Sequence, residues 1–437
     1  MNDHAFRGLQ KGSSEEVAKG TVRRRAAVMS LALAAAAIGP IAIGGAASAT
    51  STPAPTSPII TGLPSGNHPQ FLSLNQKSSL NGHARWGIPN LDTLPNFSGQ
   101  FHASGVDANG NPQSKWLTNF VGNPPEHGGT TNISAPVIPV SLQLLGPDGN
   151  PYIYMGNPLY SDATQFVSPV LNSPVFSNST YSSSDTPTQF NDAIQRAEFY
   201  PQAQRHNWHT LLNGTATPGI VENVPYGAWA ARLNPDGSCC RFVLIEYNTF
   251  NNIFGDAVNQ AINNGWTTTK AISTFLFPNT YLFFGSTSNC CVLGYHTYFY
   301  NDLANGVEQR YVVNYSSWIS PGLFGGGFQD VTAVSHEIAE TFNDPFVVSD
   351  GVHGLTPWWL APNGNCQDNM ETGDVIEGLP NAVYPITMNS YTYHPQNEAL
   401  LQWFEFQSSS DAIGGAYSYP DTSVLTGPSA PQKLYCQ

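Results

Sequence analysis

The stretch VTAVSHEIAETFNDP, residues 331–345, contains the pattern H-E-x-x-E. In an α-helix, His336 and Glu340 lie one turn apart on the same side, so both could bind one metal ion. Glu337 projects beside them, where its carboxylate could take a proton from water. The pattern is that of a metalloprotease helix in which the second metal-binding histidine has become Glu340. The alternative is an ordinary amphipathic helix with a solvated acidic face. We favour the metal site because Ala333 shares this face and two apolar strands precede the helix.

The opposite side of this helix is apolar. At 100° per residue, four side chains fall in one narrow sector and would anchor the helix in the core, namely Val331, Val334, Ile338 and Phe342. Asp330 is the predicted N-cap. Asp344 lies one turn beyond Glu340, but Pro345 disfavours helical geometry at the residue before it. The helix would therefore hold its polar face towards the reacting groups.

A metal ion needs more than two protein ligands. The downstream stretch NGNCQDNMETGDVIEG carries Glu371, Asp374 and Glu377, and we predict that Glu371 or Asp374 completes the site. His353 is a weaker candidate. The alternatives for the acidic stretch are a solvated loop or a Ca²⁺ site, because carboxylates suit hard cations. We expect Zn²⁺ as the bound divalent ion, with Ca²⁺ or another ion as the alternative.

Two further groups could take part in chemistry. His296, in LGYHTYF, is a candidate catalytic residue, as a further ligand or an oxyanion donor, and alternatively a core histidine bonded to the backbone. Trp358 and Trp359 could stack on a sugar or seal an edge of the core.

The elements that must position these residues alternate between strand and helix. A strand and the turn GPDG predict a hairpin over residues 135–156, and Thr186 is the predicted N-cap of a helix that ends before Pro201. Further elements are a helix over 248–265, buried strands over 271–285, and a hairpin over 290–320 with its turn at Asn305-Gly306. We therefore predict an α+β, zincin-like fold, in which a mixed β-sheet is followed by the active-site helix, with long ordered loops and an irregular N-terminal arm.

Composition divides the chain into three segments. Residues 1–49 combine basic residues, an apolar run and Ala47-Ser48-Ala49, which predicts a signal peptide. Residues 50–130 are rich in Pro, Ser, Asn and Gly and predict a linker or arm. Residues 131–437 form the predicted metal-binding domain. We expect no stable membrane anchor, because Gly39-Pro40 and the cleavage signal interrupt the apolar run.

Charge and cysteine content narrow the partners and the compartment. The chain has 30 acidic and 16 basic residues and a net charge of −14, so nucleic acid is not an expected partner. The even number of cysteines suits full pairing in an exported protein. We expect the adjacent pairs, Cys239-Cys240 and Cys290-Cys291, to bridge to other segments rather than within each pair. One bridge is predicted between Cys366 and Cys436.

Four stretches together resemble a known family: SHEIAETFNDP, ETGDVIEG, LGYHT and ALLQWFEF. They are similar to secreted bacterial zincin-like H-E-x-x-E proteins related to the plant phosphate-induced, exordium-like family. The resemblance spans roughly residues 130–437. It implies an extracellular protein with a metallopeptidase-like helix. The family pattern falls here on His336, Glu337, Glu340, Asp344, Pro345, Glu371, Gly373 and Asp374. One departure is Val375-Ile376, where family loops commonly carry a cysteine.

These observations favour a secreted metal-dependent peptidase that acts on a peptide or protein. His336, Glu340 and an acidic loop residue would hold the metal, and Glu337 would be the general base. The competing hypothesis is a non-catalytic extracellular protein, in which the metal stabilises the fold and the surface binds cell-wall polysaccharide or a protein. A glycosidase that uses Glu337 and Glu371 as paired carboxylates is a third possibility.

Export predicts a specific N-terminus. We expect cleavage after Ala49, because small residues at Ala47 and Ala49 match the signal-peptidase pattern. N-terminal sequencing of protein recovered from culture medium checks this, and an intact Met1 on that protein would contradict it.

Overall fold

The computed structural model describes residues 57–63, 70, 78–79, 90–106, 112–181, 186–325, 327–347, 358–367, 369–429 and 431–432. These residues belong to one compact unit, Thr56–Gln437. The predicted signal peptide lies outside the described residues.

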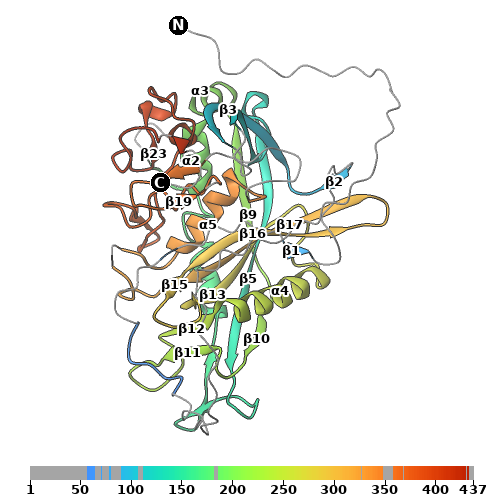
Figure 1. The fold of residues 1–437 in the computed structure, drawn as a ribbon, viewed down its shortest axis with the longest axis vertical. Helices are drawn as coiled ribbons and strands as arrows, with labels where there is room; N and C mark the ends of the chain where they lie inside the picture. Colours follow the sequence, from blue (N-terminus) through green and yellow to red (C-terminus); the bar gives the residue numbers. More distant parts are fainter. Residues whose placement is uncertain are drawn as a thin grey trace, which may run out of the picture. The chain divides into compact units, whose positions relative to one another are not determined.

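A mixed sheet forms the centre of this unit (Figure 1). In the described residues its strands run in the order β1 (Ser78–Ser79), β16 (Gly294–Asp302), β17 (Val307–Trp318), β13 (Ile272–Pro278), β5 (Thr130–Leu144) and β10 (Ile220–Val224), while β2 (Asn90–Asp92) pairs with β17, and β8 (Tyr160–Ser161) and β9 (His209–Ala216) pair with β5. The β16–β17 pair is antiparallel, whereas β17–β13, β13–β5, β5–β9 and β5–β10 are parallel. The predicted mixed sheet is confirmed. Because most of its pairs are parallel and helices lie between its strands in the sequence, the architecture is mixed α/β with few helices.

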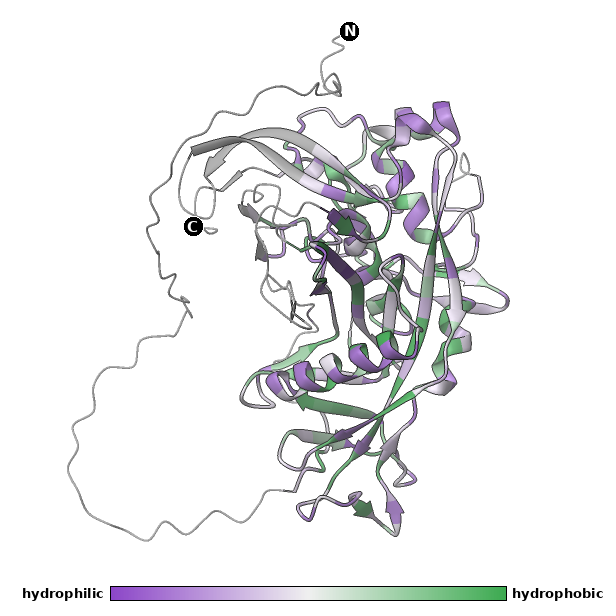
Figure 2. Cartoon of the chain, turned by 90° about the vertical axis from the view of Figure 1, so that its right-hand side faces the viewer, coloured by the Kyte–Doolittle hydropathy of each residue, from purple (hydrophilic) through white to green (hydrophobic). Residues whose placement is uncertain are grey.

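Alternating side chains of the central strands enter two different hydrophobic cores. Val137 of β5 and Ile272 of β13 pack on the face that carries helix α5 (Thr332–Asn343). Ile138 and Phe275, from the same strands, pack with helix α4 (Tyr247–Asn263) on the other face. Burial on both faces explains why these strands are continuous apolar runs. Figure 2 shows that α4 carries hydrophobic and hydrophilic residues side by side, as expected of a helix with one buried side.

The remaining helices are short. They are α1 (Val167–Leu171), α2 (Phe190–Glu198), α3 (Tyr200–His206) and α6 (Leu401–Phe404), with 3₁₀ turns at Pro125–His127, Thr164–Phe166 and Ile413–Gly415. The helix predicted after Thr186 begins later, because Gln189 is its N-cap and uses its side chain to bond Leu212 and Phe176 instead. None of the described helices is long and apolar enough to cross a membrane.

The hairpin predicted for residues 290–320 is confirmed as the antiparallel pair β16–β17. The hairpin predicted for residues 135–156 is confirmed only at its turn, where Leu145 and Pro151 form an antiparallel bridge and the Tyr152 N–H donates to the Leu144 carbonyl. Beyond the turn, Ile153–Tyr154 pairs with Asn157–Pro158, and β8 is the antiparallel partner of β5.

Smaller sheets surround the central one. In the described residues these are β11 (Trp229–Arg232), β12 (Phe242–Glu246), β14 (Thr280–Phe283) and β15 (Cys290–Val292); β18 (Trp358–Leu360), β19 (Cys366–Gln367) and β24 (Pro431–Gln432); and the pairs β3 (Asn96–Val106) with β4 (Pro112–Val121), β6 (Ile153–Tyr154) with β7 (Asn157–Pro158), β20 (Ile386–Met388) with β21 (Tyr391–Tyr393), and β22 (Glu398–Ala399) with β23 (Ser418–Tyr419).

The predicted arm is not irregular throughout. Its described part contains the long β3–β4 hairpin, and β4 packs on α5. Thr118 donates a hydrogen bond to the Asn343 carbonyl at the end of α5, and Phe120 is fully buried with Trp208. The aromatic and β-branched side chains at alternate positions of this segment explain its strand structure.

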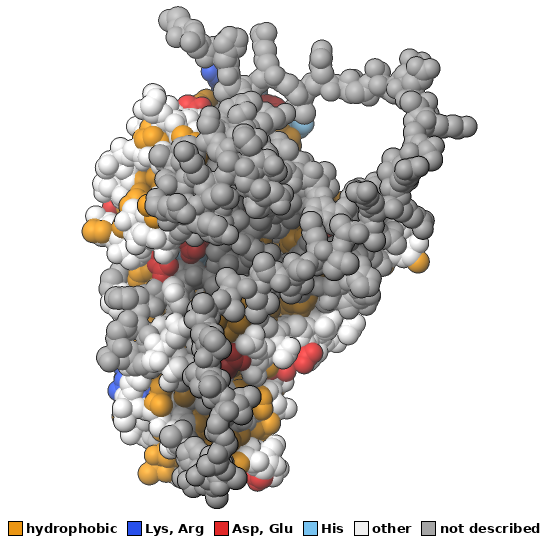
Figure 3. All heavy atoms as spheres, viewed as in Figure 1, with side chains coloured by type: hydrophobic (Ala, Val, Ile, Leu, Met, Phe, Trp, Pro, Cys, Tyr) orange, Lys and Arg blue, Asp and Glu red, His pale blue; other side chains and the backbone are white. Residues whose placement is uncertain are grey.

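Basic side chains are scarce on one face of the molecule. Figure 3 shows one face, and few Lys or Arg atoms are seen on its described part. This agrees with the acidic composition.

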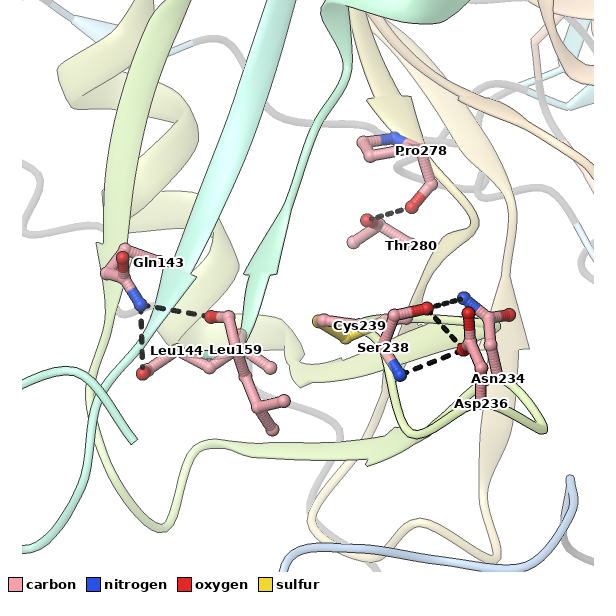
Figure 4. The surroundings of a disulfide bond; sticks show 10 residues. Gln143, Leu144, Leu159, Asn234, Asp236, Ser238, Cys239, Pro278 and Thr280 are labelled. Carbon is pink, nitrogen blue, oxygen red and sulfur yellow. Dashed lines mark hydrogen bonds between the residues drawn. A yellow bond between two sulfur atoms is a disulfide. The ribbon is translucent and has the colours of Figure 1, made fainter. Parts of the chain in front are cut away.

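The adjacent cysteines are joined within each pair, Cys239 to Cys240 and Cys290 to Cys291. The predicted bridges to other segments are therefore wrong for these four cysteines. Each pair is spanned by a cis peptide bond; Cys239-Cys240 lies in the loop before β12 (Phe242–Glu246), and Cys290-Cys291 begins β15 (Cys290–Val292). Figure 4 shows Cys239 in the loop before β12, where Ser238 bonds Asp236. The predicted Cys366–Cys436 bridge lies outside the residues whose side chains are described.

We expect no free thiol in the mature protein, and each vicinal pair should close on itself. Thiol labelling of the denatured, unreduced chain should fail. Peptide mapping without reduction should recover each pair within a single peptide. A cross-linked peptide that joins Cys240 to Cys290 would contradict this pairing.

Candidate metal centre

Three segments far apart in the sequence meet at the H-E-x-x-E helix. Strand β16 supplies His296, which points to the α5 side of the sheet, as do Tyr298 and Tyr300 two and four residues later. Helix α5 packs against β16 and β17 and presents His336, Glu337 and Glu340. The loop after β19 brings Glu371 and Asp374, and all six polar side chains are buried.

The apolar side of α5 fixes the direction of its polar side. Val331, Val334, Ile338 and Phe342 all lie in the core under the helix, which confirms the predicted sector. The predicted N-cap is wrong: Asp330 has φ of 44°, and Val331 is the N-cap without a side-chain bond. The Asp330 carboxylate instead accepts from the His394 backbone N–H and contacts the His394 ring at 2.7 Å. The same carboxylate also accepts from the backbone N–H of Val331, the N-cap residue itself.

One group of possible ligands consists of His336, Glu340 and Asp374. The His336 Nε2 atom lies 3.1 Å from Glu340 Oε2 and 3.4 Å from Asp374 Oδ1. All ligand atoms of this group lie within 4.8 Å of one another. The pair predicted one helical turn apart therefore does converge, with an acidic residue of the predicted loop.

The second group consists of His296, Glu340 and Glu371. His296 Nδ1 lies 3.5 Å from Glu340 Oε2 and 3.5 Å from Glu371 Oε2. Glu337 Oε2 approaches the same nitrogen at 3.8 Å. Both predicted loop acids therefore belong to the cluster: Asp374 to the first group and Glu371 to the second. Glu340 is a member of both groups.

The acidic loop is held against α5 by hydrogen bonds. Glu340 Oε1 accepts from the backbone N–H groups of Gly373 and Asp374, each at 3.1 Å. Gln396 Nε2 donates to the Gly373 carbonyl at 2.7 Å, and the Asn363 side chain donates to the Asp374 carbonyl at 2.6 Å. These bonds fix the backbone of the loop. The carboxylates of Glu371 and Asp374 are therefore held in place beside α5.

The other histidine is oriented by the end of α5. Asp344 is the C-cap, outside the helix as Pro345 predicts, and its carbonyl lies 3.0 Å from His296 Nε2. A carbonyl oxygen only accepts, so Nε2 carries the proton and donates it. His296 Nδ1 therefore faces the three carboxylates.

Burial and mutual charge perturb every titratable group of the cluster. Burial lowers the pKa of His296 and His336, but the carboxylates around them outweigh it and hold both pKa values well above the usual value. Burial raises the pKa of Glu337 to about 7, and burial together with the Glu340 charge raises those of Glu371 and Asp374. For Glu340 burial also raises the pKa, but the two histidines outweigh it and lower it. Such opposed shifts among neighbours are typical of functional sites.

The carboxylates of this cluster form their ion pairs with histidines. Among the described residues, Glu337 and Glu340 form ion pairs with His296 or His336 and with no Lys or Arg. Neither carboxylate oxygen of Glu337 accepts a hydrogen bond there, although the side chain is 0 % exposed. A buried carboxylate without such partners is costly unless a cation compensates it.

Two glycines lie directly against reactive side chains. A Cβ on Gly373 would overlap His336 Nδ1, and one on Gly294 would overlap the Glu337 carboxylate. Neither residue has a positive φ. Glycine is needed at these two positions because the neighbouring side chain leaves no room for a Cβ atom. Gly373 lies in the stretch ETGDVIEG and Gly294 in LGYHT, two of the stretches that carry the resemblance, but neither glycine was singled out for this close approach from the sequence.

Gly373→Ala should displace the His336 ring and weaken metal binding about 10- to 100-fold, the usual effect of disturbing the support of a ligand. Isothermal titration calorimetry with the metal ion measures this affinity. Gly427→Ala is the matched control, because its Cβ would enter open space. Equal metal affinity in Gly373→Ala and wild type would contradict the role of His336.

Other sequence candidates do not join the cluster. Glu377 belongs to neither group among the described residues, and His353 lies outside them. Trp359 is fully buried and donates to the Phe404 carbonyl, so it seals the core. The side chain of Trp358 is not among those described.

Sequence analysis missed one acidic neighbour. Glu398 is fully buried, its Oε2 accepts from Thr372, and burial raises its pKa well above the usual range. The only signal was an acid immediately before the apolar stretch ALLQWF.

Comparison with known proteins adds no relative: no protein-family model, curated protein or solved structure matches this chain.

Proposed function

We propose that the protein is a secreted, zincin-like metalloprotein that hydrolyses peptide bonds with the aid of a divalent cation held by His336, Glu340 and Asp374. The observation that carries the proposal is the convergence of these three buried side chains on one point. The resemblance of SHEIAETFNDP and ETGDVIEG to zincin-like sequences supports peptides as the substrate. The apolar run before Ala49 supports an extracellular location.

The spacing of the three ligand atoms suits a small cation. Two ligands that bind one Zn²⁺ at about 2.0–2.2 Å in tetrahedral geometry lie about 3.3–3.5 Å apart. The separations of 3.1 and 3.4 Å around His336 Nε2 are close to this value. The central imidazole favours Zn²⁺ over Ca²⁺, which takes oxygen ligands.

Glu337 is the proposed general base. A bound divalent cation supplies Lewis acidity, which makes water a nucleophile at neutral pH. Glu337 lies next to His336 on the same helix, and its oxygens accept no hydrogen bond from the described residues. An oxygen of this carboxylate can therefore accept a proton from water and later pass it to the leaving amine.

A second candidate function is favoured by burial. All six side chains of the cluster are at most 5 % exposed. The same cation would then stabilise the fold of a non-catalytic extracellular protein, whose surface binds cell-wall polysaccharide or another protein.

One experiment separates the two functions. The secreted full-length protein is purified, its metal content is measured, and the Zn²⁺-loaded form is incubated with a broad peptide library. We expect bound Zn²⁺ and cleavage that stops when a chelator removes the ion. Bound metal without cleavage would support the binding protein, and protein that binds no divalent ion would overturn both.

A further inference from the structure

We propose that His296, Glu340 and Glu371 form a second cation position and that Glu340 bridges it to the first. The inference rests on the proposed cation at His336, Glu340 and Asp374. It makes His296 a metal ligand and not an oxyanion donor, and it makes the centre a site for two divalent transition-metal ions.

The ligand distances of the second group suit a cation better than a proton. Glu340 Oε2 and Glu371 Oε2 are equidistant from His296 Nδ1, at 3.5 Å. A charge-assisted N–H···O bond spans about 2.7–2.9 Å, so a proton on Nδ1 reaches neither oxygen well. Ligands of one Zn²⁺ lie about 3.3–3.5 Å apart, which agrees with both separations.

The orientation of the His296 ring points the same way. Its Nε2–H donates to the Asp344 carbonyl, which leaves Nδ1 as the atom that faces the carboxylates. Metal-binding histidines characteristically donate their other ring N–H to a backbone carbonyl or carboxylate, which fixes the ring. His296 Nδ1 therefore faces the oxygens of Glu340 and Glu371, in the position of a ligand atom with two further ligands beside it.

Glu340 has the geometry of a bridging ligand. Its Oε1 is occupied by the N–H groups of Gly373 and Asp374. Its Oε2 is free of these bonds and approaches both histidines, at 3.1 Å from His336 Nε2 and 3.5 Å from His296 Nδ1. One oxygen is thus directed at both positions. Two-metal hydrolases hold their ions about 3.5–4 Å apart, a separation that one shared carboxylate can span.

Charge balance supplies a further argument. Four buried carboxylates, those of Glu337, Glu340, Glu371 and Asp374, surround the two rings. Metal ligands bind in their deprotonated form, and with all four carboxylates ionised one divalent cation would compensate half of their charge, whereas two would compensate all of it. Glu337 is the independent indication, because it is fully buried without a hydrogen bond from the described residues and lies 3.8 Å from His296 Nδ1.

Metal stoichiometry tests the inference. The full-length protein is stripped with a chelator, dialysed against Zn²⁺ alone, and analysed for bound zinc per chain. We expect two equivalents for wild type and one for both Glu371→Gln and Asp374→Asn, which replace a ligand oxygen with an amide of the same size. Glu398→Gln is the matched control, since Glu398 is buried nearby but belongs to neither group, and it should retain two.

A second measurement does not depend on variants that fold. Wild type loaded with Mn²⁺ alone should give the electron paramagnetic resonance spectrum of a spin-coupled pair. One equivalent of zinc and an uncoupled Mn²⁺ spectrum would overturn the second position and leave the proposed function intact. Absence of any bound metal would overturn both. Two equivalents that persist in Glu371→Gln would place the second ion elsewhere and also overturn the inference.

Discussion

Glu337→Gln is expected to abolish hydrolysis while the protein retains its cation and its fold. The amide has nearly the volume of the carboxylate and fits the same buried space, but it cannot accept the proton from water. Loss of a general base typically costs about 10²- to 10⁴-fold in rate. The loss should appear in kcat/KM for a peptide that the library identifies, with kcat reduced and KM little changed.

The control for this prediction is Glu398→Gln, the same substitution at another buried glutamate of the neighbourhood. It should cleave as wild type does. Zinc content and thermal unfolding of both variants must match wild type, so that loss of activity reports proton transfer alone. Cleavage by Glu337→Gln at the wild-type rate would remove Glu337 from the mechanism and favour the binding function.

His336→Ala is expected to lose the first cation and the stability that it provides. A ligand that binds only the folded protein stabilises it by RT ln(1 + [L]/Kd), about 4 kcal/mol at a thousandfold excess over Kd. The wild-type unfolding midpoint should therefore fall when a chelator is added. The His336→Ala midpoint should start lower and change much less with chelator.

His394→Ala provides the matched histidine control. His394 pairs with Asp330 at 2.7 Å near the start of α5 and belongs to neither ligand group. Its substitution removes the contact of this half-buried ring with the Asp330 carboxylate but should preserve the full response to chelator. If His336→Ala and wild type respond equally, His336 does not hold the cation.

Local sequence patterns were sufficient for the elements that carry the site. Apolar residues at positions 331, 334, 338 and 342 determined which side of α5 is buried, and the aromatic run GYHTYFY before the Asn305-Gly306 turn placed His296 on a hairpin strand. One helical turn between His336 and Glu340 brought their side chains together, as the H-E-x-x-E spacing predicts. These relations depend only on helix and strand geometry, which near neighbours in the sequence specify.

Only the tertiary structure decided which distant groups join them. The carboxylates of Glu371 and Asp374 reach different histidines because two backbone N–H groups hold Glu340 against their loop. Asp330 failed as an N-cap because His394, 64 residues away, takes its carboxylate. Each adjacent cysteine pair closed on itself, although longer bridges were expected. Contacts of this kind depend on which segments the central sheet brings side by side, and residue types along the chain carry little information about that choice.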